Sequence, residues 1–164
     1  MKLFKEYLLE ADEREKENDI RQSRIRFIGE REGLPKDLLH LIEKAEKVSN
    51  KYSKITVNVA LNYGGRAELT HAVKEIAKKV KNGEMSVDDI SEDVIGDYIY
   101  TAGQPDPDII VRPSGEYRLS NFLTWQSAYS EFWFSDILWP DFTEKDVNDI
   151  LFDYQKRNRR FGGV

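Results

Sequence analysis

Cysteine is absent from the 164-residue sequence, and histidine occurs only as His40 and His71. The lack of cysteine excludes a disulfide framework, a thiolate zinc site and a cysteine nucleophile, and two histidines cannot build a histidine-rich metal cluster. A chain of this length is expected to form one domain that buries roughly 70% of the surface exposed in the unfolded state. A packed core is therefore possible without disulfides or a structural metal.

Long hydrophobic runs are also missing. The longest stretch without a charged residue, residues 119–130, has twelve residues and is partly polar, whereas a membrane-spanning helix needs about 18 or more apolar residues. Charged residues interrupt the N-terminus before any stretch of signal-peptide length, so we expect a cytoplasmic protein. The net charge of -5 argues against bulk electrostatic binding of nucleic acid, so any bound anion must be held by a local cluster.

The spacing of apolar residues predicts alternating strands and helices. Helical periodicity is found over residues 2–17, 35–48, 69–80, 120–130 and 143–154. Strand-like segments are residues 24–29, 55–63, 108–112 and 131–135, of which the second is expected to be buried on both faces. Ser86 and Ser91 are predicted N-caps of short helices, and Thr143 with Asp146 is predicted to cap the last helix. The alternation predicts an α/β fold, a mostly parallel sheet with helices on both faces.

The loop after the predicted strand 108–112 carries the clearest candidate site, because ligands of open parallel sheets bind at the carboxyl ends of strands. It places Arg112 at the strand end, Arg118 six residues later and Ser120 at the start of a predicted helix. Two guanidinium groups, a hydroxyl and helix N-terminal amides suit a phosphate or diphosphate. The alternative is that both arginines are surface residues and Ser120 only caps its helix.

Glu116 and Glu131 are the acidic residues nearest this cluster. One carboxylate can suffice for Mg²⁺ when substrate phosphates complete the coordination shell, although Glu131 taken alone also fits a structural or solvated residue. Nine of the nineteen aromatic residues lie between Tyr117 and Phe142, which indicates a core seam, a protein interface or both. The glycine pair in NYGGR matches neither a phosphate-loop nor a dinucleotide pattern and predicts a tight strand-to-helix turn.

Three segments resemble conserved blocks of the cis-prenyltransferases, the undecaprenyl diphosphate synthase family. They are LNYGGRAEL at 61–69, DIIVRPSGEYRLSNFLTWQSAYSEFWFSDILWPDF at 108–142 and RRFGG at 159–163. The RPSGE segment resembles the archaeal form of its motif. The resemblance implies condensation of isopentenyl diphosphate with an allylic diphosphate to a Z-configured polyprenyl diphosphate, with Mg²⁺ as the cofactor.

The same resemblance implies roles for individual residues. It assigns the binding of the substrate diphosphate to the loop after residue 112 and the magnesium site to Glu131. It also implies that the C-terminal R-x-G element reaches the site across a homodimer interface, which part of the aromatic segment would form. The substrate-binding residues implied are Arg112, Glu116, Arg118, Leu119, Ser120, Arg160 and Gly162.

The resemblance covers the C-terminal two thirds of a family member. An aspartate-containing Asp-Gly-Asn-Arg-Arg-Trp-Ala-like loop, tunnel-lining helices and a Ser-Glu-Asn-Trp-like segment do not occur in the sequence. We therefore expect residues 1–164 to be a single, N-terminally incomplete domain without a catalytic residue of its own and with little or no activity when isolated. A noncatalytic partner subunit and a diphosphate-binding module without chemistry are the alternatives, and any membrane contact is expected to be peripheral.

Overall fold

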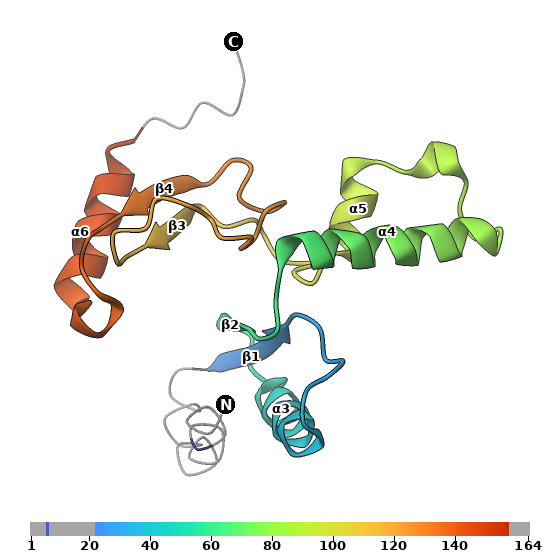
Figure 1. The fold of residues 1–164 in the computed structure, drawn as a ribbon, viewed down its shortest axis with the longest axis horizontal. Coiled ribbons are helices and arrows are strands. Elements are labelled where there is room, and N and C mark those ends of the chain that lie inside the picture. Colours follow the sequence, from blue (N-terminus) through green and yellow to red (C-terminus); the bar gives the residue numbers. More distant parts are fainter. Residues whose placement is uncertain (1–5, 7–21, 158–164) are drawn as a thin grey trace. The chain divides into compact units, whose positions relative to one another are not determined.

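The structure is a computed structural model that describes Glu6 and residues 22–157. The helix expected over residues 2–17, apart from Glu6, lies outside the described residues, as do Arg160 and Gly162. The chain forms two compact units, one up to Tyr63 and one from Gly64 onward. Both units combine parallel strands with helices (Figure 1), so the predicted α/β class is confirmed.

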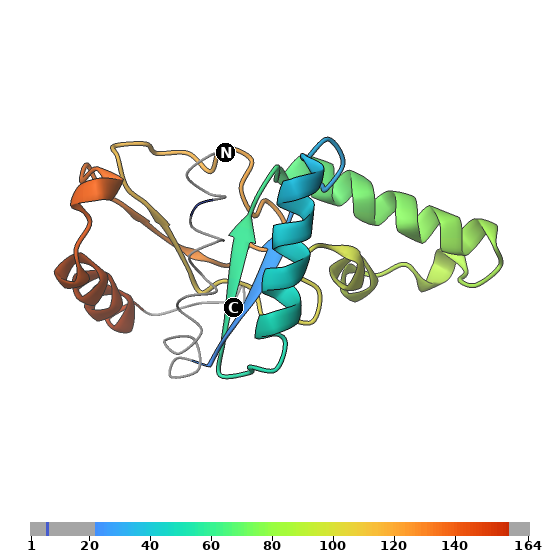
Figure 2. The same cartoon turned by 90° about the horizontal axis from the view of Figure 1, so that it is seen from below.

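The first unit is a strand–helix–strand arrangement of β1 (Ser23–Ile28), α3 (Lys36–Ser49) and β2 (Ile55–Ala60). The two strands pair in parallel, and α3 supplies the crossover that parallel strands require. Figures 1 and 2 show α3 lying along one face of the two strands. The centre of the core is two fully buried residues of α3, which pack against partly buried apolar neighbours: Leu38 and Ile42 with Phe27, Leu34, Leu41, Ala45 and Leu61.

Polar side chains of α3 bond to backbone groups of β1. The N–H of Ile25 donates to Ser49 Oγ at 3.0 Å, and the N–H of Phe27 donates to Glu46 Oε1 at 2.9 Å. Because these N–H groups belong to the edge of β1 that β2 does not use, α3 closes that edge against another strand.

The exposure of β2 differs from the sequence prediction. Ile55 is 49% exposed and Val57 is 43% exposed, so the expectation of a strand buried on both faces is wrong. The reason is that α3, the single helix among residues 22–63, packs against β1 and leaves side chains of β2 uncovered. The strand also ends at Ala60 rather than at residue 63.

The second unit contains one long helix, a second parallel strand pair and shorter helical segments. Its elements are α4 (Gly65–Lys81), η1 (Val87–Asp89), α5 (Glu92–Tyr98), β3 (Ile109–Arg112), β4 (Glu131–Phe134), η2 (Trp139–Asp141) and α6 (Glu144–Gln155). The predicted caps of η1, α5 and α6 are confirmed, with Ser86, Ser91 and Thr143 at the N-cap positions. The hydroxyl and the N–H of Thr143 both donate to Asp146, and these bonds lower the pKa of that carboxyl.

The helix predicted over residues 120–130 is absent from the structure, where this segment is a series of turns. Ser120, Asn121 and Leu123 have φ values of 51°, 63° and 44°, which belong to the left-handed region and interrupt a right-handed helix. Apolar periodicity alone could not reveal this, because it reports which side chains are buried and not the backbone conformation. Ser120 is therefore not a helix cap, and the helix N-terminal amides expected beside it are not available.

Candidate functional site

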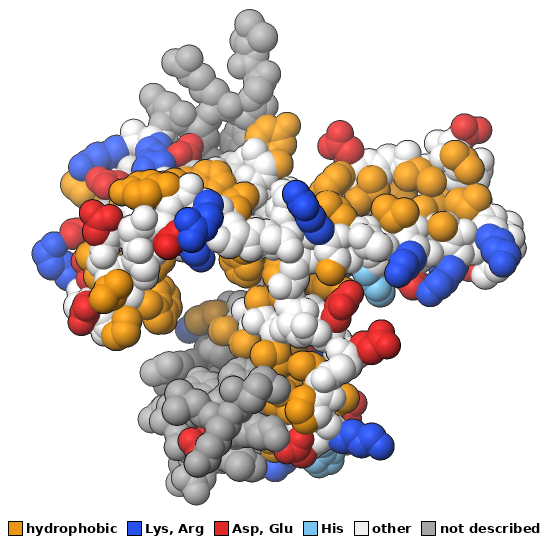
Figure 3. All heavy atoms as spheres, in the orientation of Figure 1, with side chains coloured by type: hydrophobic (Ala, Val, Ile, Leu, Met, Phe, Trp, Pro, Cys, Tyr) orange, Lys and Arg blue, Asp and Glu red, His pale blue; other side chains and the backbone are white. Residues whose placement is uncertain are grey.

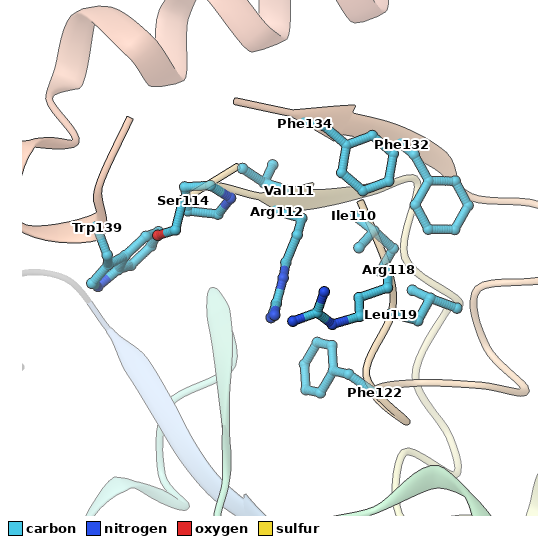
Figure 4. A pocket seen from close by; sticks show the side chains of 11 residues that line it. Ile110, Val111, Arg112, Ser114, Arg118, Leu119, Phe122, Phe132, Phe134 and Trp139 are labelled. Carbon is cyan, nitrogen blue, oxygen red and sulfur yellow. The ribbon is translucent and has the colours of Figure 1, made fainter. Parts of the chain in front are cut away.

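The candidate site is built on the carboxyl end of β3. β3 and β4 pair in parallel so that Ile110 lies opposite Phe132 and Arg112 lies opposite Phe134. Since side chains alternate between the faces of a strand, these four residues share one face. The two phenylalanine rings stack at 5.9 Å with an interplanar angle of 8°. They form part of the wall of a cavity of about 420 Å³ (Figure 4).

Two arginines that lie close together in the sequence enter this cavity. Arg112 comes from the end of β3 and Arg118 from the following loop, and Figure 4 shows their guanidinium groups directed toward one another. Arg118 also forms an ion pair with Glu116. Convergence of two like charges is unfavourable by itself, and a bound anion would relieve it. The predicted meeting of these arginines at one cavity is thus observed.

Arg112 has an unused hydrogen-bonding group. Its Nε is buried and has no hydrogen-bond partner within the described part of the chain. Its Nη2 lies 3.5 Å from Ser120 Oγ, at the outer limit of a hydrogen bond. A buried donor without a partner costs free energy, so this N–H is available for an oxygen of a ligand.

Left-handed residues shape the loop that connects these groups. Ser114 has a φ of 76°, and Ser120 and Asn121 follow with 51° and 63°. Such values are uncommon for residues other than glycine and persist where the surroundings enforce them, frequently at binding sites. They turn the chain back after Arg118 and bring the Ser120 hydroxyl toward Arg112.

Apolar residues complete the cavity. Leu119, for which the resemblance implies substrate binding, is one of the lining residues. The other apolar lining residues include Phe122, Phe132, Phe134 and Trp139, none of which was singled out from the sequence as a site residue. The concentration of aromatic residues between Tyr117 and Phe142 was the available signal, but it could not distinguish a cavity wall from a core. The cavity therefore offers cationic donors next to an apolar surface, which fits an anion joined to a hydrocarbon group.

Glu131 lies apart from the arginine cavity. It begins β4, opposite Ile109, whereas Arg112 ends β3, and alternation places it on the other face of the strand pair. There its carboxylate pairs with Arg157 at 2.7 Å, next to Ile150 and Tyr154 of α6. The structure thus brings Arg112, Arg118, Leu119 and Ser120 together with Glu116 nearby, and it does not bring Glu131 to them.

The fit to Mg²⁺ depends on a bound diphosphate. Among the described residues no three histidine, aspartate or glutamate side chains are grouped to hold a metal ion. Glu116 is the carboxylate paired with a cavity arginine, and a single carboxylate suffices for Mg²⁺ only when ligand phosphates supply the remaining oxygens. The donor set therefore fits a Mg²⁺–diphosphate complex and not a free ion.

A second, larger cavity of the same unit has the opposite charge. It measures about 740 Å³ and its lining includes four acidic residues, Glu92, Asp93, Asp97 and Asp106. Burial raises the pKa of Asp106. Because carboxylates repel a diphosphate, charge rather than volume favours the arginine cavity as the candidate site.

Known proteins share this combination of sequence and fold. The family described as "Putative undecaprenyl diphosphate synthase" matches residues 1–162. The chain belongs to this family. An isoprenyl transferase of Clostridium perfringens is 46% identical over the whole chain, and one of Geobacillus kaustophilus is 49% identical over 86% of it. The chain spans 64% and 55% of the lengths of these two relatives.

Two solved members show the same architecture. The lavandulyl diphosphate synthase of Lavandula x intermedia, in complex with dimethylallyl diphosphate, has a TM-score of 0.92 and 34% identity. That likeness covers 99% of this chain and 70% of the lavender chain. A probable undecaprenyl diphosphate synthase of Campylobacter jejuni has a TM-score of 0.83 and 28% identity, covering 99% of this chain and 72% of its own. The predicted prenyltransferase fold is confirmed.

The two isoprenyl transferases named above, which are 46% and 49% identical over the aligned residues, come from bacteria, and the archaeal character of the RPSGE segment stays a prediction. None of the helices in the described ranges is both long enough and apolar enough to cross a bilayer.

Proposed function

We propose that residues 1–164 belong to a single cis-prenyltransferase domain, in which the arginine cavity binds the diphosphate of isopentenyl diphosphate for condensation with an allylic diphosphate. The observation that carries the proposal is the buried, unpartnered Nε of Arg112 in a cavity that Arg118 also enters. In support, the resemblance assigns substrate binding to these same residues, and the lavender relative carries dimethylallyl diphosphate.

Each side chain of the site has a distinct part in this proposal. Arg112 and Arg118 donate to the diphosphate oxygens, and the Ser120 hydroxyl adds a third donor. Glu116 orients Arg118 through their ion pair. The apolar wall, which includes Leu119 and Phe132, packs against the hydrocarbon part of the substrate.

Charge stabilisation is the chemical task of such a site. Breaking the C–O bond of an allylic diphosphate leaves negative charge on the departing group, and preorganised guanidinium groups stabilise charge of this kind. Mg²⁺, when bound with a diphosphate, would neutralise part of the same charge as a Lewis acid. The Z configuration of the product and the Mg²⁺ requirement are parts of the proposal.

We further propose that the functional unit is a homodimer. Glu131 lies on the face away from its own cavity and contacts Arg157, which is three residues before Arg160 in the R-x-G element. Glu131 would therefore serve the cavity of a second subunit rather than its own, and the resemblance implies the same for the R-x-G element. Exposed aromatic side chains in the second unit, including Tyr129 at 66% and Trp139 at 67%, support an interface, and Figure 3 shows further hydrophobic side chains along α4 and α5.

Binding and turnover of the 164-residue chain test the proposed function separately. We expect inorganic pyrophosphate to bind in isothermal titration calorimetry, and little or no product to form from isopentenyl and farnesyl diphosphates. Absence of pyrophosphate binding would refute the site, and robust turnover would refute the expected inactivity. Restoration of activity only by a copurifying catalytic homologue would favour the noncatalytic-subunit alternative.

The variant Glu131→Gln tests the proposed place of Glu131. We expect the affinity for pyrophosphate without Mg²⁺ to stay within about twofold of wild type, because Glu131 lies on the opposite face from the arginines. The gain in pyrophosphate affinity on adding Mg²⁺ should be smaller in Glu131→Gln than in wild type only at protein concentrations at which dimers form. Calorimetry measures the affinity, and sedimentation equilibrium measures the fraction of dimer. A loss of Mg²⁺ dependence in the monomer would contradict the assignment across subunits.

A further inference from the structure

The start of α4 is capped by a residue from a distant loop. The N–H of Gly65 donates to the backbone oxygen of Asn121 at 2.7 Å, and the N–H of Arg66 donates to Asn121 Oδ1 at 2.9 Å. The first N–H groups of a helix lack partners within it, and the N-cap residue, Gly64, has no side chain to offer. Asn121, 55 residues further along the chain than Arg66, therefore takes the role of the N-cap side chain.

The glycine pair makes this contact possible. A Cβ on Gly64 would lie 2.7 Å from Asn121 Nδ2, and a Cβ on Gly65 would lie 2.3 Å from Thr124 Oγ1. Both distances are far below van der Waals contact. A side chain at Gly64 would displace the Asn121 amide group, and a side chain at Gly65 would also press on the Cβ and backbone nitrogen of Thr124 and so shift the loop. The pair is thus more than a strand-to-helix turn, because it provides the surface on which residues 121–124 rest.

About one turn further along α4, a buried polar contact joins the segment after Ser120 to the helix. Gln126 is 1% exposed, and its Nε2 lies 3.1 Å from both carboxylate oxygens of Glu68, which is fully buried. Gln126 Nε2 also lies 3.0 Å from Thr101 Oγ1, and Glu68 accepts from the N–H of Tyr100. The segment after Ser120 is therefore held at two levels along α4.

This attachment acts on the residue next to Asn121. Ser120 has a φ of 51°, a conformation that is unfavourable for a serine and needs support from its surroundings. It is this conformation that directs Ser120 Oγ toward Arg112. Asn121 is itself left-handed, with a φ of 63°, and asparagine tolerates that region better than most residues.

We propose that Asn121 is a positioning residue for the diphosphate site: by capping α4 it holds Ser120 in the left-handed conformation that presents its hydroxyl to the ligand. The identity of the ligand rests on the proposed function. The capping geometry and its effect on Ser120 rest on the contacts of Asn121 alone.

The test compares Asn121→Ala with Thr143→Ala, which removes the capping box of α6. Both variants should lower the melting temperature, since each removes a helix cap. Asn121→Ala should weaken pyrophosphate binding about tenfold in calorimetry, which corresponds to about 1.4 kcal/mol, and Thr143→Ala should leave it unchanged. Asn121→Ala should also speed amide hydrogen exchange at Gly65 and Arg66, and Asn121→Asp should restore the protection because aspartate caps equally well.

A double-mutant cycle shows whether Asn121 acts through Ser120. In a Ser120→Ala background, Asn121→Ala should cause no further loss of affinity, because the positioned hydroxyl is already gone. A full tenfold loss in that background, equal losses in Asn121→Ala and Thr143→Ala, or wild-type affinity of Asn121→Ala would each overturn the proposal. Failure of the wild-type chain to bind pyrophosphate would instead overturn the proposed function, while the exchange protection of Gly65 and Arg66 would still report on the cap.

Discussion

Replacing Arg112 and Arg118 together by alanine is expected to weaken pyrophosphate binding at least about 100-fold. Each guanidinium supplies charge-assisted hydrogen bonds to the anion, and a hydrogen bond to a charged group contributes about 1.5–3 kcal/mol. Loss of one such bond from each arginine removes about 3 kcal/mol or more, which exceeds two factors of ten. Calorimetry at fixed, low ionic strength measures the change, because screening weakens anion binding in every variant.

The matched control for this variant is Lys78→Ala with Lys79→Ala. These lysines lie in the last turn of α4 and are exposed, and their removal changes the net charge by the same two units. We expect the control to retain pyrophosphate affinity within about threefold. If both double variants lost affinity equally, the anion would be responding to net charge, and the arginine cavity would not be its site.

Gly65→Ala is expected to be the most damaging single substitution in the second unit. Its Cβ would lie 2.3 Å from Thr124 Oγ1, 2.9 Å from Thr124 Cβ and 3.0 Å from the Thr124 backbone nitrogen. The Cβ and the backbone nitrogen of Thr124 cannot be moved by a side-chain rotation, so the loop itself must shift. Overpacking of this kind costs about 1–3 kcal/mol, and we expect a value near the upper end together with weaker pyrophosphate binding.

Gly96→Ala provides the control for Gly65→Ala within the same unit. Gly96 lies in α5, and a Cβ there would meet no atom within 4 Å. Since alanine is favoured over glycine in helices by up to about 1 kcal/mol, this variant should be neutral or stabilising in thermal unfolding. Thr124→Gly should partly rescue Gly65→Ala, because it removes the hydroxyl and the Cβ but not the backbone nitrogen. Equal melting temperatures of the two alanine variants would show that the loop does not rest on the start of α4.

The sequence predicts the elements whose signals are local. The strands around residues 23–28, 109–112 and 131–134 and the helices that begin near Lys36 and Glu144 are found within a few residues of their predicted bounds. Alternating polarity, capping residues and strand-forming side chains encode these elements over short distances. The convergence of Arg112 and Arg118 also follows from local information, because both lie close to the end of one strand.

Other parts of the site depend on contacts that no local pattern encodes. The left-handed turn at Ser120 is stabilised by the cap that Asn121 provides to α4. The periodicity of apolar residues over 120–130 does not report this contact and predicts a helix instead. The buried pair of Glu68 and Gln126 joins residues 58 positions apart, so neither residue is conspicuous in the sequence. The position of Glu131 on the far face required the register between β3 and β4, which spacing along the chain does not define.

The N–H groups of Ile25 and Phe27 in β1 donate to side chains of α3. The two edges of the β1–β2 pair therefore differ in how readily they can accept a further strand. A further strand could be added beside β1 only by breaking these bonds, which favours its addition at the other end of the strand pair, beside β2. The same bonds disfavour pairing of two copies of the protein through their β1 edges. Edge-to-edge aggregation is therefore favoured only on the β2 side of the strand pair.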